Sequence, residues 1–113
     1  MRKQQKVFVI GLDGATFDLL LPWVKSGKLP ALNRLIKRGI SGPLLSTFPP
    51  LTGPAWSSFM TGKSPAQHGI LEFFRRKENS YQQVLNNRMD IDGGSLWHYL
   101  SEAGKQVGVM GVP

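Results

Sequence analysis

Val7-Phe8-Val9-Ile10-Gly11-Leu12-Asp13-Gly14 is the stretch of sequence that decides the fold class of this chain. Residues 7–12 are apolar and partly β-branched, and they show no alternation of polar and apolar positions. Such a run is typical of a strand that is buried on both faces in a parallel sheet. Gly11, Asp13 and Gly14 then end the run abruptly. The sequence therefore predicts a buried strand over residues 7–12.

Two helices are predicted after this strand. The first begins near Thr16 and has apolar residues at helical spacing: Phe17, Leu20, Leu21 and Val24. Pro22 leaves two alternatives, a bend in this helix or a second start. The second helix is predicted over Pro30–Arg38, because proline suits a first helical position and a basic last turn precedes Gly39.

The remaining elements continue the alternation of strands and helices. We expect a strand over residues 42–48, a proline-rich loop, a helix over Ala55–Met60, and a helix capped by Ser95 that closes at Gly104. The polar stretch 72–87 is ambiguous and could form a hairpin around Asn79 and Ser80. A strand over residues 106–112 follows.

This order of elements is typical of an α/β fold with a parallel sheet. A buried strand at 106–112 would need a helix to cover it, so we expect residues 1–113 to form a single partial domain of a longer protein. The apolar edge left open would make self-association plausible.

Composition and charge limit the class of protein. With 113 residues, one domain is the ceiling, and 41% hydrophobic residues argue against wholesale disorder. The absence of cysteine excludes disulfides and thiolate metal sites. Fourteen Lys and Arg against seven Asp and Glu give a net charge of +7, which favours anionic partners such as nucleic acid, phosphorylated metabolites or membrane surfaces.

The sequence shows neither a membrane span nor a leader peptide. The longest apolar run, residues 7–12, is far shorter than the roughly 20 residues that a membrane-spanning helix needs. The basic residues before it could suggest a signal peptide, but the run is too short and has no small-residue cleavage site. We therefore expect a cytoplasmic protein.

Two glycine motifs look like nucleotide-binding loops but fail in detail. Thr61-Gly62-Lys63-Ser64 matches the end of a P-loop, yet Ser57 stands where the pattern requires glycine, and Pro65 follows at once. Gly11 and Gly14 lack the third glycine of a dinucleotide fingerprint, and a carboxylate lies between them. Neither motif supports a nucleotide-binding loop.

Two other positions could bind a ligand. Asp13 leaves the predicted first strand, where ligands collect in open α/β sheets, so it could bind a metal ion; the alternative is that it caps the next helix. Thr52 precedes a short helix, where backbone amides could hold a phosphate; the alternative here is again a helix cap.

Histidines and the densest basic run favour structural roles. His68 and His98 are the only histidines, and we interpret both as structural rather than as metal ligands. Arg75-Arg76-Lys77 follows Phe73 and Phe74 and could contact nucleic acid, but a solvated loop is the favoured interpretation.

Three blocks of sequence, taken together, resemble the alkaline phosphatase superfamily and, within it, the type I phosphodiesterase and nucleotide pyrophosphatase family. They are residues 7–14, residues 46–62 (STFPPLTGPAWSSFMTG) and His68-Gly69-Ile70. The resemblance extends from about Val7 to Pro113. It implies the N-terminal part of an alkaline-phosphatase-like parallel-sheet sandwich with helices on both faces.

The resemblance also implies site residues and chemistry. The aspartate that ends the first strand is a metal ligand in that family, which corresponds to Asp13. The threonine nine residues before a Thr-Gly pair is the nucleophile and also contacts metal, which corresponds to Thr52. Thr47 resembles the nucleophile motif of animal members, but counting back from Thr61 selects Thr52. The implied reaction is hydrolysis of a small-molecule phosphate ester with two divalent ions, usually zinc.

The sequence departs from the family pattern in two ways. Ala55 and Trp56 replace an asparagine and a histidine of the animal members, so the substrate is not implied. The other metal ligands have no recognisable counterpart, so we expect the chain alone to bind metal weakly and to turn over little substrate. The alternative function is a small basic α/β domain that binds an anionic partner without catalysis; nucleic acid is not the favoured partner.

Overall fold

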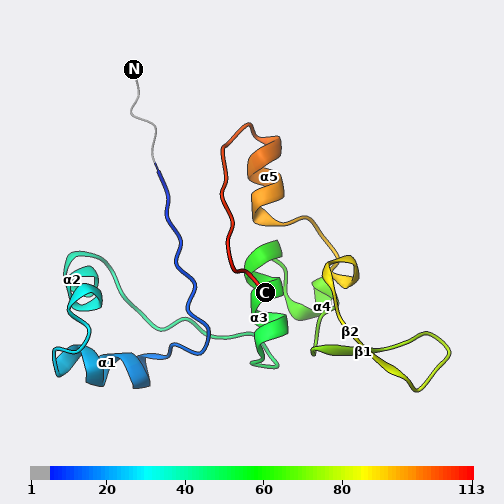
Figure 1. The fold of residues 1–113 in the computed structure, drawn as a ribbon, viewed down its shortest axis with the longest axis horizontal. Helices are drawn as coiled ribbons and strands as arrows, with labels where there is room; N and C mark the ends of the chain where they lie inside the picture. Colours follow the sequence, from blue (N-terminus) through cyan, green and yellow to red (C-terminus); the bar gives the residue numbers. More distant parts are fainter. Residues whose placement is uncertain (1–5) are drawn as a thin grey trace. The chain divides into compact units, whose positions relative to one another are not determined.

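The computed structural model describes residues 6–113 and divides the chain into two compact units (Figure 1). The first unit runs to Leu44, and the second covers Leu45–Pro113. The helices of each unit contact other helices of the same unit.

The first unit contains α1 (Phe17–Lys25) and α2 (Pro30–Arg38), which contact each other. Both helices were predicted from the sequence and are confirmed. Pro22 lies inside α1 without ending it, and Pro30 opens α2. The predicted apolar faces are partly buried at these positions: Phe17, Leu20, Val24, Leu32 and Ile36.

The second unit is built around α3 (Thr52–Thr61), which contacts both α4 (Pro65–His68) and α5 (Leu96–Glu102). The sequence predicted a helix from Ala55, but α3 begins at Thr52. The predicted start was too late because Pro54, together with the preceding Pro49 and Pro50, is typical of a loop. A proline is tolerated in the first turn, because the N–H it lacks has no partner within the helix there.

A hairpin and a 3-10 helix complete the second unit. Strands β1 (Phe74–Arg76) and β2 (Gln83–Leu85) pair in antiparallel fashion, with Arg75 opposite Val84. Asn79 lies in the connecting loop with a φ of 53°, so the hairpin alternative is confirmed. The 3-10 helix η1 (Arg88–Asp90) follows β2.

The three predicted parallel strands are not paired in the structure, and this corrects the sequence analysis. Within residues 6–113, β1 and β2 form the only sheet. Residues 7–12, 42–48 and 106–112 contain no strand, and many of their apolar side chains are exposed, including Phe8 at 88% and Met110 at 95%. A strand is stabilised by ladder hydrogen bonds and by cover on both faces, and none of these segments has a paired neighbour. The fold is α/β in character, with helices and a small sheet.

The core of the second unit lies around α3 and is small. Met60 and Ile70 are buried apolar side chains, at 5% and 3% exposure. His68 and Pro54 are fully buried, and Ser57 and Ser95 are nearly so. Among the described residues, no buried side-chain nitrogen or oxygen lacks a hydrogen-bond partner.

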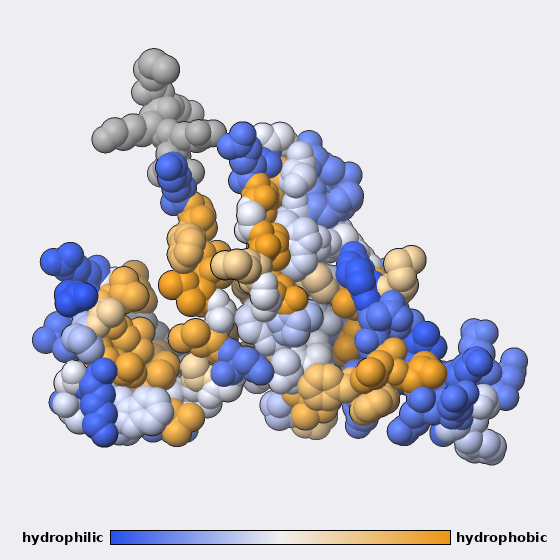
Figure 2. All heavy atoms as spheres, viewed as in Figure 1, coloured by the Kyte–Doolittle hydropathy of each residue, from blue (hydrophilic) through white to orange (hydrophobic). Residues whose placement is uncertain are grey.

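Hydrophobic side chains also cover much of the surface, as Figure 2 shows. Many of those with large exposed fractions lie outside the helices and strands; they include Val7, Phe8, Ile40, Leu44 and Met110. No helix in the described part of the chain has the length and apolar character to cross a membrane.

Candidate active site around Thr52

Thr52 is the first residue of α3, and Leu51 is the extended N-cap before it, with φ −114° and ψ 153°. Thr52 is therefore not the N-cap residue, which was the alternative to a functional role. The Ala55 N–H donates to the Leu51 carbonyl at 3.0 Å, and Pro54 has no N–H. The first two N–H groups of α3 are those of Thr52 and Gly53. They lie at the positive end of the helix dipole, where an anion is stabilised.

A hollow of about 380 Å³ lies beside Thr52. Its walls include Trp56 from α3, the apolar side chains of Ile70 and Phe73, and Arg88 from η1. The Arg88 guanidinium donates to the carbonyls of Ile91 at 3.1 Å and Gly93 at 2.8 Å. Its charge is therefore held in place next to a largely apolar surface.

The segment that follows α4 lies against the start of α3. A Cβ atom on Gly53 would meet Ile70 Cγ2 and Phe73 Cδ1, both at 3.8 Å, and the Glu72 carbonyl at 3.7 Å. These are ordinary van der Waals separations. Residues 70–73 therefore contact the residue next to Thr52 without crowding it.

Ser58 and His68 form a hydrogen-bonded pair inside this unit, with Ser58 Oγ 2.9 Å from His68 Nε2. The Ile70 N–H donates to His68 Nδ1 at 3.1 Å, so Nδ1 is unprotonated. In a neutral imidazole the proton is then on Nε2, so the Nε2–H group donates the hydrogen bond and Ser58 Oγ accepts it. The ring cannot take the Ser58 proton in this tautomer. The pair is therefore not a nucleophile and base, and the structural interpretation of His68 is supported.

The environment of His68 also disfavours its charged form. Burial lowers the pKa of this histidine below its ordinary value of 6.5, and the positive charge of Lys63 lowers it further. Backbone hydrogen bonds with Pro54 and with His68 itself act in the opposite direction but do not cancel the effect of burial. The ring is held neutral near pH 7.

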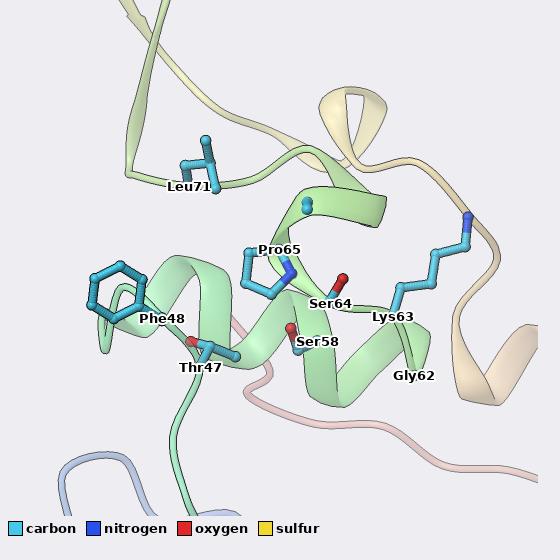
Figure 3. Close-up of a pocket in the computed structure, with 9 residues that line it drawn as sticks. Thr47, Phe48, Ser58, Gly62, Lys63, Ser64, Pro65 and Leu71 are labelled. Atoms are coloured by element: carbon cyan, nitrogen blue, oxygen red, sulfur yellow. The ribbon is translucent and has the colours of Figure 1, made fainter.

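Thr47 faces a different hollow, of about 690 Å³, that Thr52 does not line (Figure 3). The Thr47 hydroxyl donates to the Pro49 carbonyl at 2.9 Å. Lys63, also at this hollow, extends to Asp92 at 3.7 Å. The residues before Lys63 are helical and Pro65 opens α4, so the structure agrees with the exclusion of a P-loop.

Asp13 lies in the first unit, in the turn before α1, and its side chain is exposed. The N-cap of α1 is Thr16, so Asp13 is not the N-cap residue. Among residues 6–113 there is no group of three or more His, Asp or Glu side chains that could hold a metal ion. Asp13 and Thr52 each carry a side-chain oxygen that could bind a metal ion, but neither belongs to such a group among the described residues.

The remaining sequence candidates make contacts within the chain. His98 lies 3.3 Å from Glu102 on the exposed face of α5. In the basic run, Arg75 pairs with Asp90 at 2.7 Å, and Arg76 lies over the Tyr81 ring at 5.3 Å. These contacts favour the structural interpretation over a nucleic-acid surface.

The arrangement around Thr52 places a hydroxyl at a helix start beside a hollow. Residues 7–113 match the model of the family described as type I phosphodiesterase / nucleotide pyrophosphatase. The chain belongs to this family. The resemblance expected from the three sequence blocks is therefore confirmed. Comparison with curated proteins and with solved structures gave no match.

Members of the type I phosphodiesterase / nucleotide pyrophosphatase family are hydrolases of phosphate-ester small molecules and are generally metal-dependent. Sequence reasoning about this family member selected Thr52 but missed the contacts of His68 with Ser58 and Ile70. The capping-box pattern Ser64-x-x-Gln67 was the available signal: the Ser64 N–H donates to Gln67 Oε1 at 3.0 Å, and His68 follows at the end of α4.

Proposed function

We propose that this chain supplies the nucleophile of a metal-dependent phosphodiesterase or nucleotide pyrophosphatase, and that the nucleophile is Thr52. The observation that carries the proposal is the position of Thr52 at the first residue of α3, beside the hollow, in a chain of this family. Asp13 and Thr52 are proposed as ligands of the family's metal ions, which we expect to be two divalent ions, zinc in the first instance.

The residues of α3 suit a developing phosphorane. The Thr52 Oγ would form a bond to phosphorus and give up its proton, while the bond to the leaving oxygen breaks and that oxygen takes up a proton. Water would later attack the same phosphorus, and Thr52 Oγ would leave and regain a proton. Negative charge builds on the phosphoryl oxygens in this step, and the positive end of the α3 dipole stabilises it. Bound metal would supply further charge stabilisation, as in other phosphoryl-transfer sites.

The chain by itself is proposed to be a poor catalyst. Structural zinc takes four ligands, and a two-metal site needs roughly six or more protein ligands. The family resemblance assigns two ligands, Asp13 and Thr52, and the described residues hold no cluster of three His, Asp or Glu side chains. We also propose that, within the complete domain of the family, the apolar segments 7–12, 42–48 and 106–112 pair as strands of a parallel-sheet sandwich, with Asp13 at the end of the first; among the described residues they have no such neighbours.

The test is divalent-metal-dependent hydrolysis of an activated phosphodiester by the chain, by Thr52→Ala and by Thr47→Ala, a change of the same kind outside the hollow. Hydrolysis that is lost in Thr52→Ala and retained in Thr47→Ala supports the nucleophile. Equal hydrolysis by Thr52→Ala and the unsubstituted chain contradicts it.

A binding measurement covers the case in which no variant hydrolyses the ester. Titration with orthophosphate, followed by NMR, should then shift the amides of Thr52 and Gly53 in the chain and in Thr47→Ala. Unchanged amide signals at the start of α3 would contradict an anion site there.

A further inference from the structure

Each nitrogen of the His68 ring has a hydrogen bond within the second unit. It is fully buried between α3 and the segment after α4. Its backbone is also fixed, because the Asp92 N–H donates to the His68 carbonyl at 3.0 Å and Gly69 ends α4 with a φ of 83°. The ring therefore has little freedom to change its position.

One side of the ring holds the first two turns of α3. Nε2 lies 2.9 Å from Ser58 Oγ, and Pro54, one turn before Ser58, is fully buried like the ring. Pro54 is two residues after Thr52, and Ser58 is one turn further along the helix. Figure 3 shows Ser58 on the side of α3 toward the start of α4. The ring thus fixes the backbone near Thr52.

The other side of the ring holds the segment that packs beside Thr52. Nδ1 accepts the Ile70 N–H at 3.1 Å. The Ile70 side chain is 3% exposed, and its Cγ2 lies 3.8 Å from the position of a Cβ on Gly53. Both ring nitrogens therefore act on structures that adjoin the nucleophile.

We propose that His68, in its neutral form with the proton on Nε2, is a positioning residue that fixes the start of α3 and thereby the Thr52 hydroxyl. The proposal rests on the proposed function only for the role of that hydroxyl. His68 touches neither substrate nor the reacting atoms; it acts through Ser58 and Ile70. A specific tautomer is required, because the opposite one would place two N–H donors against each other at Ile70.

Two substitutions of His68 test the hydrogen bonds of the two ring nitrogens separately. In His68→Gln the side-chain amide can still donate near Ser58, but the acceptor for the Ile70 N–H is lost. In His68→Asn the side-chain oxygen can still accept from Ile70, but the donor for Ser58 is lost. Ser58→Ala removes one acceptor with less disturbance, and Ser101→Ala, on the exposed side of α5, serves as the control.

The measurement is amide hydrogen exchange at the two ends of α3 in the 113-residue chain. Ala55 reports the first turn, through its bond to Leu51, and Gly62 reports the last, through its bond to Ser58. We expect Ala55 exchange to rise about tenfold relative to Gly62 in His68→Asn, which is the loss expected for one buried hydrogen bond. Ser58→Ala should show a smaller rise, and His68→Gln should restore most of the protection.

Several results would overturn the proposal. Equal loss of protection at Ala55 and Gly62 in Ser58→Ala and in both His68 variants would mean that His68 stabilises the whole unit. Unchanged exchange at Ala55 would mean that it holds nothing there. If the His68 variants do not fold, the ¹⁵N shifts of the ring in the unsubstituted chain decide: a protonated Nδ1 refutes the proposal, and a protonated Nε2 together with the Ser58→Ala result supports it.

The proposed function can fail separately. If Thr52→Ala leaves hydrolysis and phosphate binding unchanged while the exchange pattern holds, His68 positions the start of α3 but Thr52 is not the nucleophile.

Discussion

Arg75 Nε lies 2.7 Å from Asp90 Oδ1, and this ion pair joins the β1–β2 hairpin to η1. Asp90 is 17% exposed and also accepts the Asn87 N–H at 2.9 Å. Arg75 is 43% exposed, so solvent screens the pair. The contact nevertheless links two segments that line the hollow beside Thr52.

We expect Arg75→Gln to lower the free energy of unfolding by about 0.5 kcal/mol, because the pair is largely at the surface. The matched control is Arg76→Gln, which removes a cation that lies over the 92% exposed Tyr81 ring and should change less. Urea unfolding measures both, and the Arg75 effect should shrink in high salt. A salt-independent effect would contradict an ionic origin.

The stability of the second unit should depend on pH through His68. Burial lowers the pKa of this ring below 6.5 in the folded chain, so the unfolded chain binds the proton first as the pH falls. The contribution of neutral His68 to the free energy of unfolding is therefore fully present above the unfolded pKa. It decreases as the pH falls below 6.5 and levels off below the folded pKa. Urea unfolding followed from about pH 8 to about pH 5 should show this slope.

His68→Gln should remove the pH dependence, whereas His98→Gln, which replaces the exposed histidine, should retain it. The same slope in His68→Gln as in the unsubstituted chain would mean that another group titrates.

Two glycines, one within α3 and one at its end, should respond to alanine in opposite directions. A methyl group on Gly53 would make only ordinary contacts, and Gly53 has no positive φ, so Gly53→Ala should raise the free energy of unfolding by about 0.5 to 1 kcal/mol. Gly62 has open space but a φ of 69°, so Gly62→Ala should lower it by about 1 kcal/mol. Thermal unfolding followed by circular dichroism gives both signs, and a loss of stability in Gly53→Ala would show that the contact with residues 70–73 is tighter than described.

Ser95 should contribute as the N-cap of α5. Its hydroxyl oxygen accepts the His98 N–H at 3.3 Å, and the side chain is 4% exposed. Ser95→Ala should destabilise the chain by about 1 kcal/mol. Ser101→Ala, in the same helix but exposed, should change the stability by less than about 0.5 kcal/mol. Similar values for the two variants would argue against the cap.

Local signals predicted most of the helices. The bounds of α2 follow from Pro30 and the basic last turn before Gly39, and the end of α3 follows from Gly62, because these residues act within one helical turn. The start of α3 was missed because Pro54 fits a loop and a first helical turn equally well. The predicted parallel strands depend on neighbours distant in sequence, which an apolar run such as residues 7–12 does not specify.

In the candidate site, too, local signals could be predicted from the sequence, whereas contacts between residues distant in sequence could not. Thr52 was selected by counting back from Thr61, and it lies at the start of α3. The packing of Ile70 beside Gly53 and the hydrogen bonds of His68 depend on how α4 folds back onto α3, and no periodicity reveals them.

The buried centre of the second unit is small, and half of its residues are polar. Its buried apolar residues are Met60, Ile70 and Pro54, and its buried polar residues are His68, Ser57 and Ser95. Heat capacity rises on unfolding chiefly because apolar surface becomes hydrated, and it falls when polar surface does. The chain should therefore show an increment below the usual 12 to about 15 cal/mol/K per residue. The curve of its stability against temperature would then be shallow.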